Sequence, residues 1–193
     1  MHRFLIRQMR PDDISRLTDL RPGFVSQTML KIEQTGSGLA LGWRLVEVEL
    51  PIPYDKGGLY DFDVFERADI TRRLAQTNSL MEVAVESVGG RIVGVLDVEE
   101  EGWRHVAWVH NIMLDIDARR QGLGRRLVER TIAWARRRGL RAVMLETQTN
   151  NVPACLFYLR LGFQLVGINT AFYTNHDLER DEVALFWSYP LQP

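Results

Sequence analysis

Two glycines, Gly122 and Gly124, follow an apolar run that is typical of a strand and precede a pattern that is typical of a helix. Arg119 and Arg125 flank them. Glycine at such a junction lets backbone N–H groups approach an anion closely, and a helix N-terminus carries partial positive charge. The segment therefore predicts a site for a phosphate or pyrophosphate group.

Two common phosphate-binding motifs do not fit this segment. A dinucleotide fingerprint needs a third glycine where Leu127 stands, and a P-loop needs Gly-Lys-Ser/Thr, which is absent. The remaining pattern, Arg119-x-x-Gly122-x-Gly124 before an amphipathic helix, resembles the pyrophosphate loop of the GNAT acyltransferase superfamily. For these six residues alone, a plain glycine turn is an equal alternative.

A second segment, residues 150–163, reads Asn-Asn-Val-Pro-Ala-Cys-Leu-Phe-Tyr-Leu-Arg-Leu-Gly-Phe. It resembles the GNAT segment in which an asparagine precedes a helix that carries a tyrosine before Gly-Phe. Three stretches resemble the streptothricin acetyltransferases more narrowly: residues 145–155, the late strand 183–187 and Pro-Tyr-Asp-Lys at 53–56. The resemblance implies a GNAT fold and an N-acetyltransferase that uses acetyl-CoA.

The resemblance also implies which residues hold the acetyl-CoA. Backbone amides of the glycine turn would bind the pyrophosphate, and the edge of the preceding strand would pair with the pantetheine arm, with no metal involved. The predicted contacts are Ile112, Met113, Leu114, Arg119, Arg120, Gln121, Gly122, Leu123, Gly124, Arg125 and Asn151.

The chemistry needs a base and an acid. A lysine-type amine has a pKa near ~10.4, so a proton must leave it, and the departing thiolate must gain one. Tyr158 stands where family members carry the acid, although a tyrosine packed against the sheet is the alternative. His110, predicted to share a strand face with Ile112 and Leu114, stands where some GNAT enzymes carry a catalytic histidine. The streptothricin acetyltransferases that the chain resembles carry a glutamate there, so this chain departs from the narrower pattern. A histidine satisfied within the sheet is the alternative.

Charge is segregated along the chain. Seven acidic residues accompany two basic ones between residues 47 and 69, and nine arginines accompany one glutamate between 119 and 141. An acidic acceptor side suits a cationic amine, and the resemblance makes a streptothricin-like antibiotic the first to test. A protein-lysine or polyamine acetyltransferase and a non-catalytic CoA-binding sensor are the alternatives. The candidate acceptor residues are Tyr54, Tyr60, Asp61, Asp63, Glu82 and Glu146.

Periodicity predicts the elements that position these residues. Alternation predicts strands, and apolar residues at helical spacing predict helices. The expected strands are 4–7, 43–50, 80–86, 91–99, 104–114, 142–147 and 183–187. One expected helix begins at Pro11. The other expected helices cover residues 69–76, 123–138 and 153–161. Prolines predict an irregular segment over 51–58, and 21–42 stays unassigned. The expected class is α/β (α+β), a mixed, mostly antiparallel central sheet flanked by helices.

Length, net charge, apolar runs and cysteine content set limits on the remaining expectations. The 193 residues fit a single domain, 1–193, in which 21–79 forms a variable acceptor side. A net charge of −1 argues against nucleic-acid binding. The absence of an apolar run near ~20 residues argues against a membrane span. One cysteine and no signal-peptide pattern predict a cytoplasmic protein. A homodimer is compatible with these properties.

Overall fold

The computed structural model describes residues 3–57 and 62–191, and its contacts divide the chain into two compact units. The first unit comprises Met1–Gly23, Gly57–Leu145 and Tyr189–Pro193, and the second comprises Phe24–Lys56 and Glu146–Ser188. The expectation of a single domain stays a prediction.

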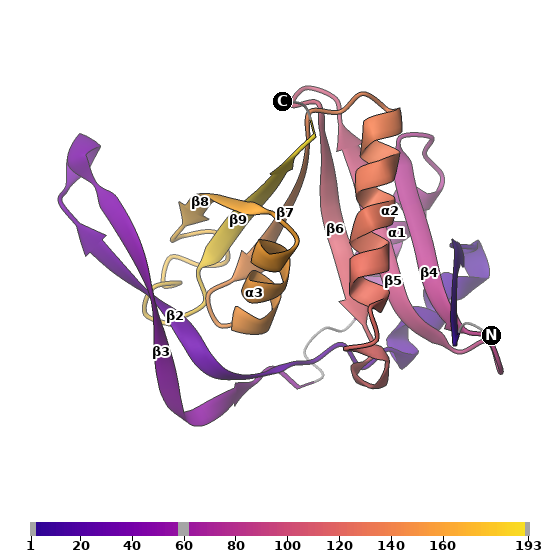
Figure 1. Cartoon of the computed structure of the whole chain (residues 1–193), viewed down its shortest axis with the longest axis horizontal. Coiled ribbons are helices and arrows are strands. Elements are labelled where there is room, and N and C mark those ends of the chain that lie inside the picture. Colours follow the sequence, from indigo (N-terminus) through magenta and orange to yellow (C-terminus); the bar gives the residue numbers. More distant parts are fainter. Residues whose placement is uncertain (1–2, 58–61, 192–193) are drawn as a thin grey trace. The chain divides into compact units, whose positions relative to one another are not determined.

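The first unit is built on strands in the spatial order β1-β4-β5-β6-β7. Their bounds are β1 Phe4–Gln8, β4 Ser79–Glu86, β5 Ile92–Glu101, β6 Val106–Leu114 and β7 Ala142–Gln148. Neighbours from β1 to β6 are antiparallel, whereas β6 and β7 are parallel. The helices of this unit are η1 Pro11–Asp19, α1 Val64–Leu74, η3 Ile116–Ala118 and α2 Leu123–Arg137, with α2 leading from β6 to β7 (Figure 1).

Helices cover both faces of this part of the sheet, because successive side chains of a strand point to opposite faces. Val83 packs in a cluster with Leu17 of η1 and Ile70 of α1. Its neighbour Ala84 packs in the other cluster with Leu123 of α2. The strand predicted for residues 80–86 therefore contributes side chains to two hydrophobic cores, one on each face of the sheet.

The second unit contains the end of β7, the helix α3 Val152–Arg160 and strands in the order β7-β9-β8. β8 covers Gln164–Asn169 and β9 covers Ala184–Pro190. A separate antiparallel ribbon joins β2 Val25–Thr35 to β3 Gly42–Asp55, with the short η2 Gly38–Ala40 at its tip (Figure 1). The predicted class, a mixed and mostly antiparallel sheet with helices, is confirmed by this architecture.

The irregular segment predicted over residues 51–58 was wrong for residues 51–55, because β3 continues through both prolines to Asp55. The register with β2 explains how. Ser26 pairs with Tyr54 and Thr28 pairs with Glu49, so Pro51 and Pro53 lie in the bulged stretch between these pairs. A bulge leaves residues out of the hydrogen-bond ladder, so the missing N–H of proline costs nothing there.

Other boundaries also differ from the prediction. α1 begins at Val64 rather than residue 69, because Asp63 caps it by accepting a hydrogen bond from the Glu66 amide at 2.8 Å. β2 and β8 were not predicted. Among the described residues, no helix combines the length and apolar character that a bilayer crossing needs.

The chain leaves the first unit at Gly23 and returns to it at Gly57. These two residues are in close contact, since a Cβ atom on Gly23 would lie 1.8 Å from the Gly57 carbonyl oxygen. Only glycine fits at residue 23 in this backbone arrangement.

Candidate active site

The predicted anion-binding turn adopts two left-handed residues just before α2. Arg120 has φ +58° and Gly122 has φ +77°, and α2 starts at Leu123. The N-cap Gly122 has no side chain to cap the helix, and the Arg126 amide makes the first helical bond, to the Gly122 carbonyl at 3.1 Å. The amides of the first turn before Arg126 are therefore left to an external acceptor.

The surroundings of this turn suit an anion. A Cβ atom at Gly122 would meet nothing within 4 Å among the described residues, so the space over the turn is open. The first turn of α2 contains no acidic residue and carries the exposed Arg125 and Arg126. Positive charge and uncapped amides together fit a pyrophosphate group.

Two of the predicted cofactor residues brace the turn through their side chains. Arg119 donates to the Leu114 carbonyl from Nε at 3.2 Å and from Nη2 at 3.0 Å, and also to the Pro22 carbonyl. Gln121 donates to the Asp117 carbonyl at 2.9 Å. These side chains fix the shape of the turn, while Arg120 and Arg125 are exposed.

The edge of β6 that precedes the turn is partly free of its neighbour. The parallel register with β7 pairs Val106–Val109 and goes no further within the described residues. On the other side, the Asp115 amide donates to the Val93 carbonyl at 2.9 Å. Antiparallel alternation then directs the backbone groups of Ile112 and Leu114 away from β5 and those of Met113 toward it. Arg119 occupies the Leu114 carbonyl, so Ile112 is the residue best suited to pair with an extended ligand.

His110 lies at a β-bulge. Asp97 pairs with Asn111 and Val98 pairs with Val109, so His110 is an extra residue of β6. Its Nε2 lies 3.3 Å from a Glu99 oxygen. Burial, and then the Arg73 charge, lower the pKa of His110 against the opposite effect of the nearby carboxylates, so that the imidazole is neutral at pH 7.

The predicted shared face of His110, Ile112 and Leu114 was wrong, because the count assumed a regular strand without a bulge. Glu99, the partner of His110, also pairs with Arg72 of α1, whereas Leu114 packs with Leu123 of α2. The bulge therefore separates His110 from Leu114 onto opposite faces of the sheet.

Glu82, a predicted acceptor residue, is engaged by α2. Both of its carboxylate oxygens accept hydrogen bonds from Arg130, one of them from Nε at 2.5 Å, and the Glu82 side chain is only 6% exposed. The pair satisfies both charges, so Glu82 has little capacity left for an amine.

Tyr158 is placed by α3 in the second unit. Asn151 caps this helix by accepting a hydrogen bond from the Ala154 amide at 3.2 Å, and Pro153 lies in its first turn. The Tyr158 ring is buried, with its centroid 5.1 Å from that of Phe157 and 5.3 Å from that of Phe163 in edge-to-face contacts. The tyrosine is therefore held in one orientation by aromatic packing.

The residue before the cap, Asn150, was not predicted. Its side chain is buried, and its Oδ1 has no hydrogen-bond partner among the described residues. A buried acceptor without a partner is costly, so this oxygen is available to a donor from a water molecule or a ligand. The only sequence signal that could have identified Asn150 is its position next to Asn151, a predicted cofactor residue.

Glu146 lies in a cluster of polar groups. The Tyr173 hydroxyl donates to Glu146 Oε1, and Gln148 Nε2 donates to the Tyr173 hydroxyl at 3.0 Å. Burial raises the pKa of Glu146 above its usual range, partly offset by the Tyr173 hydrogen bond and the charge of Lys56. Tyr173 was not predicted, because no periodic pattern marks its loop.

Tyr54 lies beside the same charges. Its ring centroid is 5.8 Å from that of Phe24, and burial raises the pKa of its hydroxyl while Lys56 and Glu182 act on it in opposite directions. The predicted acceptor residues Tyr60 and Asp61 lie outside the described residues, and Asp63 serves as the cap of α1.

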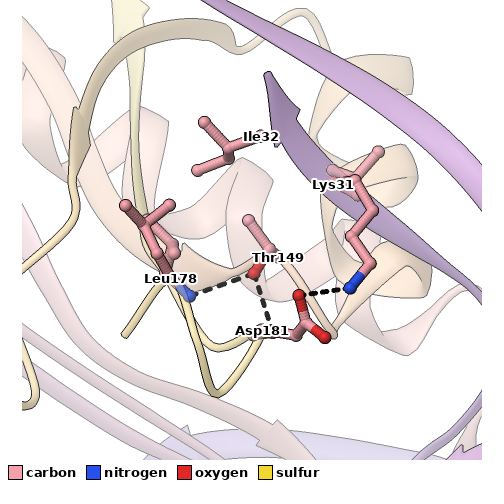
Figure 2. A pocket seen from close by; sticks show the side chains of 7 residues that line it. Lys31, Ile32, Thr149, Leu178 and Asp181 are labelled. Carbon is pink, nitrogen blue, oxygen red and sulfur yellow. Dashed lines mark hydrogen bonds and ion pairs between the residues drawn. The ribbon is translucent and has the colours of Figure 1, made fainter. Parts of the chain in front are cut away.

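The second unit also contains a cavity of about 310 Å³ (Figure 2). Lys31 and Asp181 form an ion pair of 2.5 Å at its wall, and Thr149 Oγ1 donates to the Asp181 carbonyl at 3.0 Å. Its lining residues are Leu30, Lys31, Ile32, Thr149, Leu178, Asp181 and Val183. None of them belongs to the predicted site.

Comparisons with known proteins add to this geometry. The model of the acetyltransferase (GNAT) family matches residues 44–163. The streptothricin acetyltransferase of Streptomyces lavendulae is 29% identical over 187 residues, 95% of this chain and 93% of the relative. The streptothricin acetyltransferase of Escherichia coli is 27% identical over 177 residues, which are 92% of this chain and 91% of the relative.

Solved structures agree in fold. The crystal structure of nourseothricin acetyltransferase superposes with a TM-score of 0.81 at 28% identity, covering 99% of this chain and all of that one. A Bacillus anthracis str. Ames structure, a streptothricin acetyltransferase candidate in complex with acetyl coenzyme A, has a TM-score of 0.76 at 24% identity over 98% of both chains.

Proposed function

The chain belongs to the acetyltransferase (GNAT) family and is an N-acetyltransferase, and we propose that its acceptor is a primary amine of a streptothricin-type cationic antibiotic. The observation that carries this proposal is the extent of the similarity. Two relatives named streptothricin acetyltransferase match 92% and 95% of the chain, and a third, from Bacillus subtilis, matches 45% of it. The ribosomal protein bS18-alanine N-acetyltransferase of Escherichia coli K12 is 35% identical over only 41% of it.

Acetyl-CoA supplies the activated acetyl group, and the chain offers groups that suit its parts. We assign the pyrophosphate to the first-turn amides of α2 with Arg120 and Arg125, and the pantetheine arm to the edge at Ile112. The Asn150 oxygen, buried and without a hydrogen-bond partner among the described residues, would accept a hydrogen bond from a donor of a bound substrate. Arg119 serves by holding the turn.

Proton transfer needs two groups of the chain. Tyr158 is assigned as the acid for the thiolate, since a phenol with a pKa of ~10 can protonate it. Glu146 is assigned as the group that receives the ammonium and its proton. Its raised pKa supports this, as does its place on the strand that leads into the helix of Tyr158. His110 is the second candidate for the base, because it is neutral at pH 7.

The test is thiol release from acetyl-CoA with a panel of amines: streptothricin, spermidine and a lysine peptide. We expect the highest kcat/KM with streptothricin. A higher value with spermidine or the peptide would replace the acceptor, and CoA binding without turnover would indicate a sensor. Glu146→Gln and His110→Ala separate the two bases, since only loss of the true base removes the acidic limb of the pH profile.

A further inference from the structure

We propose that Lys56 is a specificity-determining residue of the acceptor site, because its ammonium neutralises Glu182 and leaves one carboxylate, Glu146, for one ammonium group of the acceptor. The inference rests on the proposed function, which assigns the acceptor amine to Glu146. It concerns side chains of the second unit alone.

Lys56 is held in a fixed place at the end of β3. Its amide donates to the Phe24 carbonyl at 3.0 Å, its side chain is only 13% exposed, and its Nζ lies 2.8 Å from Glu182 Oε1. A lysine ammonium this deep in a protein is rare unless it is paired. The ion pair therefore joins a mostly buried ammonium to the Glu182 side chain, which is 35% exposed.

The loop that carries Glu182 and Tyr173 is also fixed from within. Asp177, which is 1% exposed, accepts hydrogen bonds from the amides of Phe172, Tyr173 and Thr174 at 2.8, 2.9 and 2.7 Å. The Glu182 amide in turn donates to the Asp177 carbonyl at 3.1 Å. Tyr173 and Glu182 are thus presented by one preorganised loop.

The charges around Glu146 do not balance. Among the described residues, the groups that act on it are Lys56 just after β3, Gln148 from β7, Tyr173 and Glu182 from the loop, and Cys155 from α3. Lys56 stabilises the ionised form of Glu146, whereas Glu182 destabilises it. Counted over the residues that the structure describes, the cluster has one ammonium and two carboxylates, a net charge of −1 when both carboxylates are ionised. It is complementary to one added ammonium group, beside the hydroxyl of Tyr173.

Removal of the Lys56 charge would change this count. Glu182 would lose its partner, and the cluster would reach a net charge of −2. The pKa of Glu146 would rise, because an attractive charge is lost and a repulsive one is no longer offset. The second ammonium group of a diamine could then pair with Glu182. The affinity for diamines relative to monoamines would therefore increase.

The experiment compares Lys56→Met with Lys56→Arg and Lys31→Met. Lys31 is the matched control, since it forms an ion pair of the same kind with Asp181 in the same unit. Carbon-13 NMR titration of the Glu146 carboxyl, assigned with Glu146→Gln, gives its pKa in each variant. The same signal gives the dissociation constants of pentylamine and cadaverine at neutral pH.

In Lys56→Met we expect the pKa of Glu146 to rise by about one unit and the cadaverine-to-pentylamine affinity ratio to rise about fivefold. Lys56→Arg and Lys31→Met should leave both near wild type, and the KM for acetyl-CoA should stay unchanged in all three. An unchanged pKa or an unchanged ratio in Lys56→Met, with a wild-type melting temperature, would overturn the proposal.

The result is separable from the proposed function. Failure of the wild-type enzyme to acetylate streptothricin would refute the acceptor, whatever Lys56→Met does to the Glu146 signal. Normal turnover of streptothricin together with an unmoved Glu146 signal in Lys56→Met would refute the role of Lys56 alone.

Discussion

Replacement of Gly122 by alanine tests the anion-binding turn most directly. The residue has φ +77°, and an added Cβ would meet nothing within 4 Å, so the variant pays for backbone strain and not for a clash. A left-handed conformation costs a residue with a Cβ about 1–2 kcal/mol. For a chain of this size, that lowers the melting temperature by about 2–8 °C.

Binding should suffer more than stability does. A methyl group over the turn would occupy the space in which the pyrophosphate meets the first-turn amides of α2, so we expect the KM for acetyl-CoA to rise about tenfold or more. The acceptor KM should change little. Thermal unfolding gives the first quantity, and initial rates of thiol release at varied acetyl-CoA concentrations give the second.

Gly89→Ala is the matched control. Gly89 has φ +80°, and a Cβ there would also meet nothing within 4 Å, but it lies in the hairpin between β4 and β5. The two variants should lose similar stability, and only Gly122→Ala should raise the KM for acetyl-CoA. Equal KM values in the two variants would refute the assignment of the turn.

Three further results are expected. Tyr158→Phe should lower kcat about 100-fold with little change in the KM for acetyl-CoA, because the phenol acts on the leaving thiolate; unchanged steady-state kinetics would remove its role. Asp97→Ala should lower the free energy of unfolding in urea by about 3–5 kcal/mol, since it leaves the buried guanidinium of Arg73 unpaired; a loss below 1 kcal/mol would contradict this. Asp13 has its pKa lowered mainly by the Arg7 hydrogen bond, so its stabilising effect is present above the unfolded pKa of ~3.9 and is lost as the pH falls. The stability advantage of wild type over Asp13→Asn should therefore begin to fall below about pH 4, and a constant difference between the two in urea unfolding at pH 3 and pH 7 would disprove it.

The sequence predicts the parts of the fold that have a local cause. Residues 80–86 are mainly apolar because both faces of β4 are covered, and Gly89 and Gly90 take the positive φ that a tight hairpin needs. The glycine turn before α2 was recognisable for the same reason, since its backbone conformation and its uncapped helix start both follow from Gly122.

The parts that were missed depend on distant partners. The bulge at His110 arises from pairing with β5, and no local residue type announces it. β3 passes through two prolines because β2 shifts its register opposite them. The contact of Tyr173 with Glu146 depends on a loop tied together by Asp177, so neither residue alone indicates it.

The contact of Gly23 with Gly57 has an evolutionary consequence. The segment between these glycines departs from the first unit and rejoins it at nearly the same point. A segment whose two ends touch can be lengthened, shortened or exchanged with little disturbance to the structure that it interrupts. Changes in the β2–β3 ribbon would thus spare the first unit, whereas within the second unit the segment is tied to Asp181 and Glu182 by ion pairs. On the function proposed above, changes in this segment would alter the acceptor while the glycine turn of the first unit keeps the same acetyl donor.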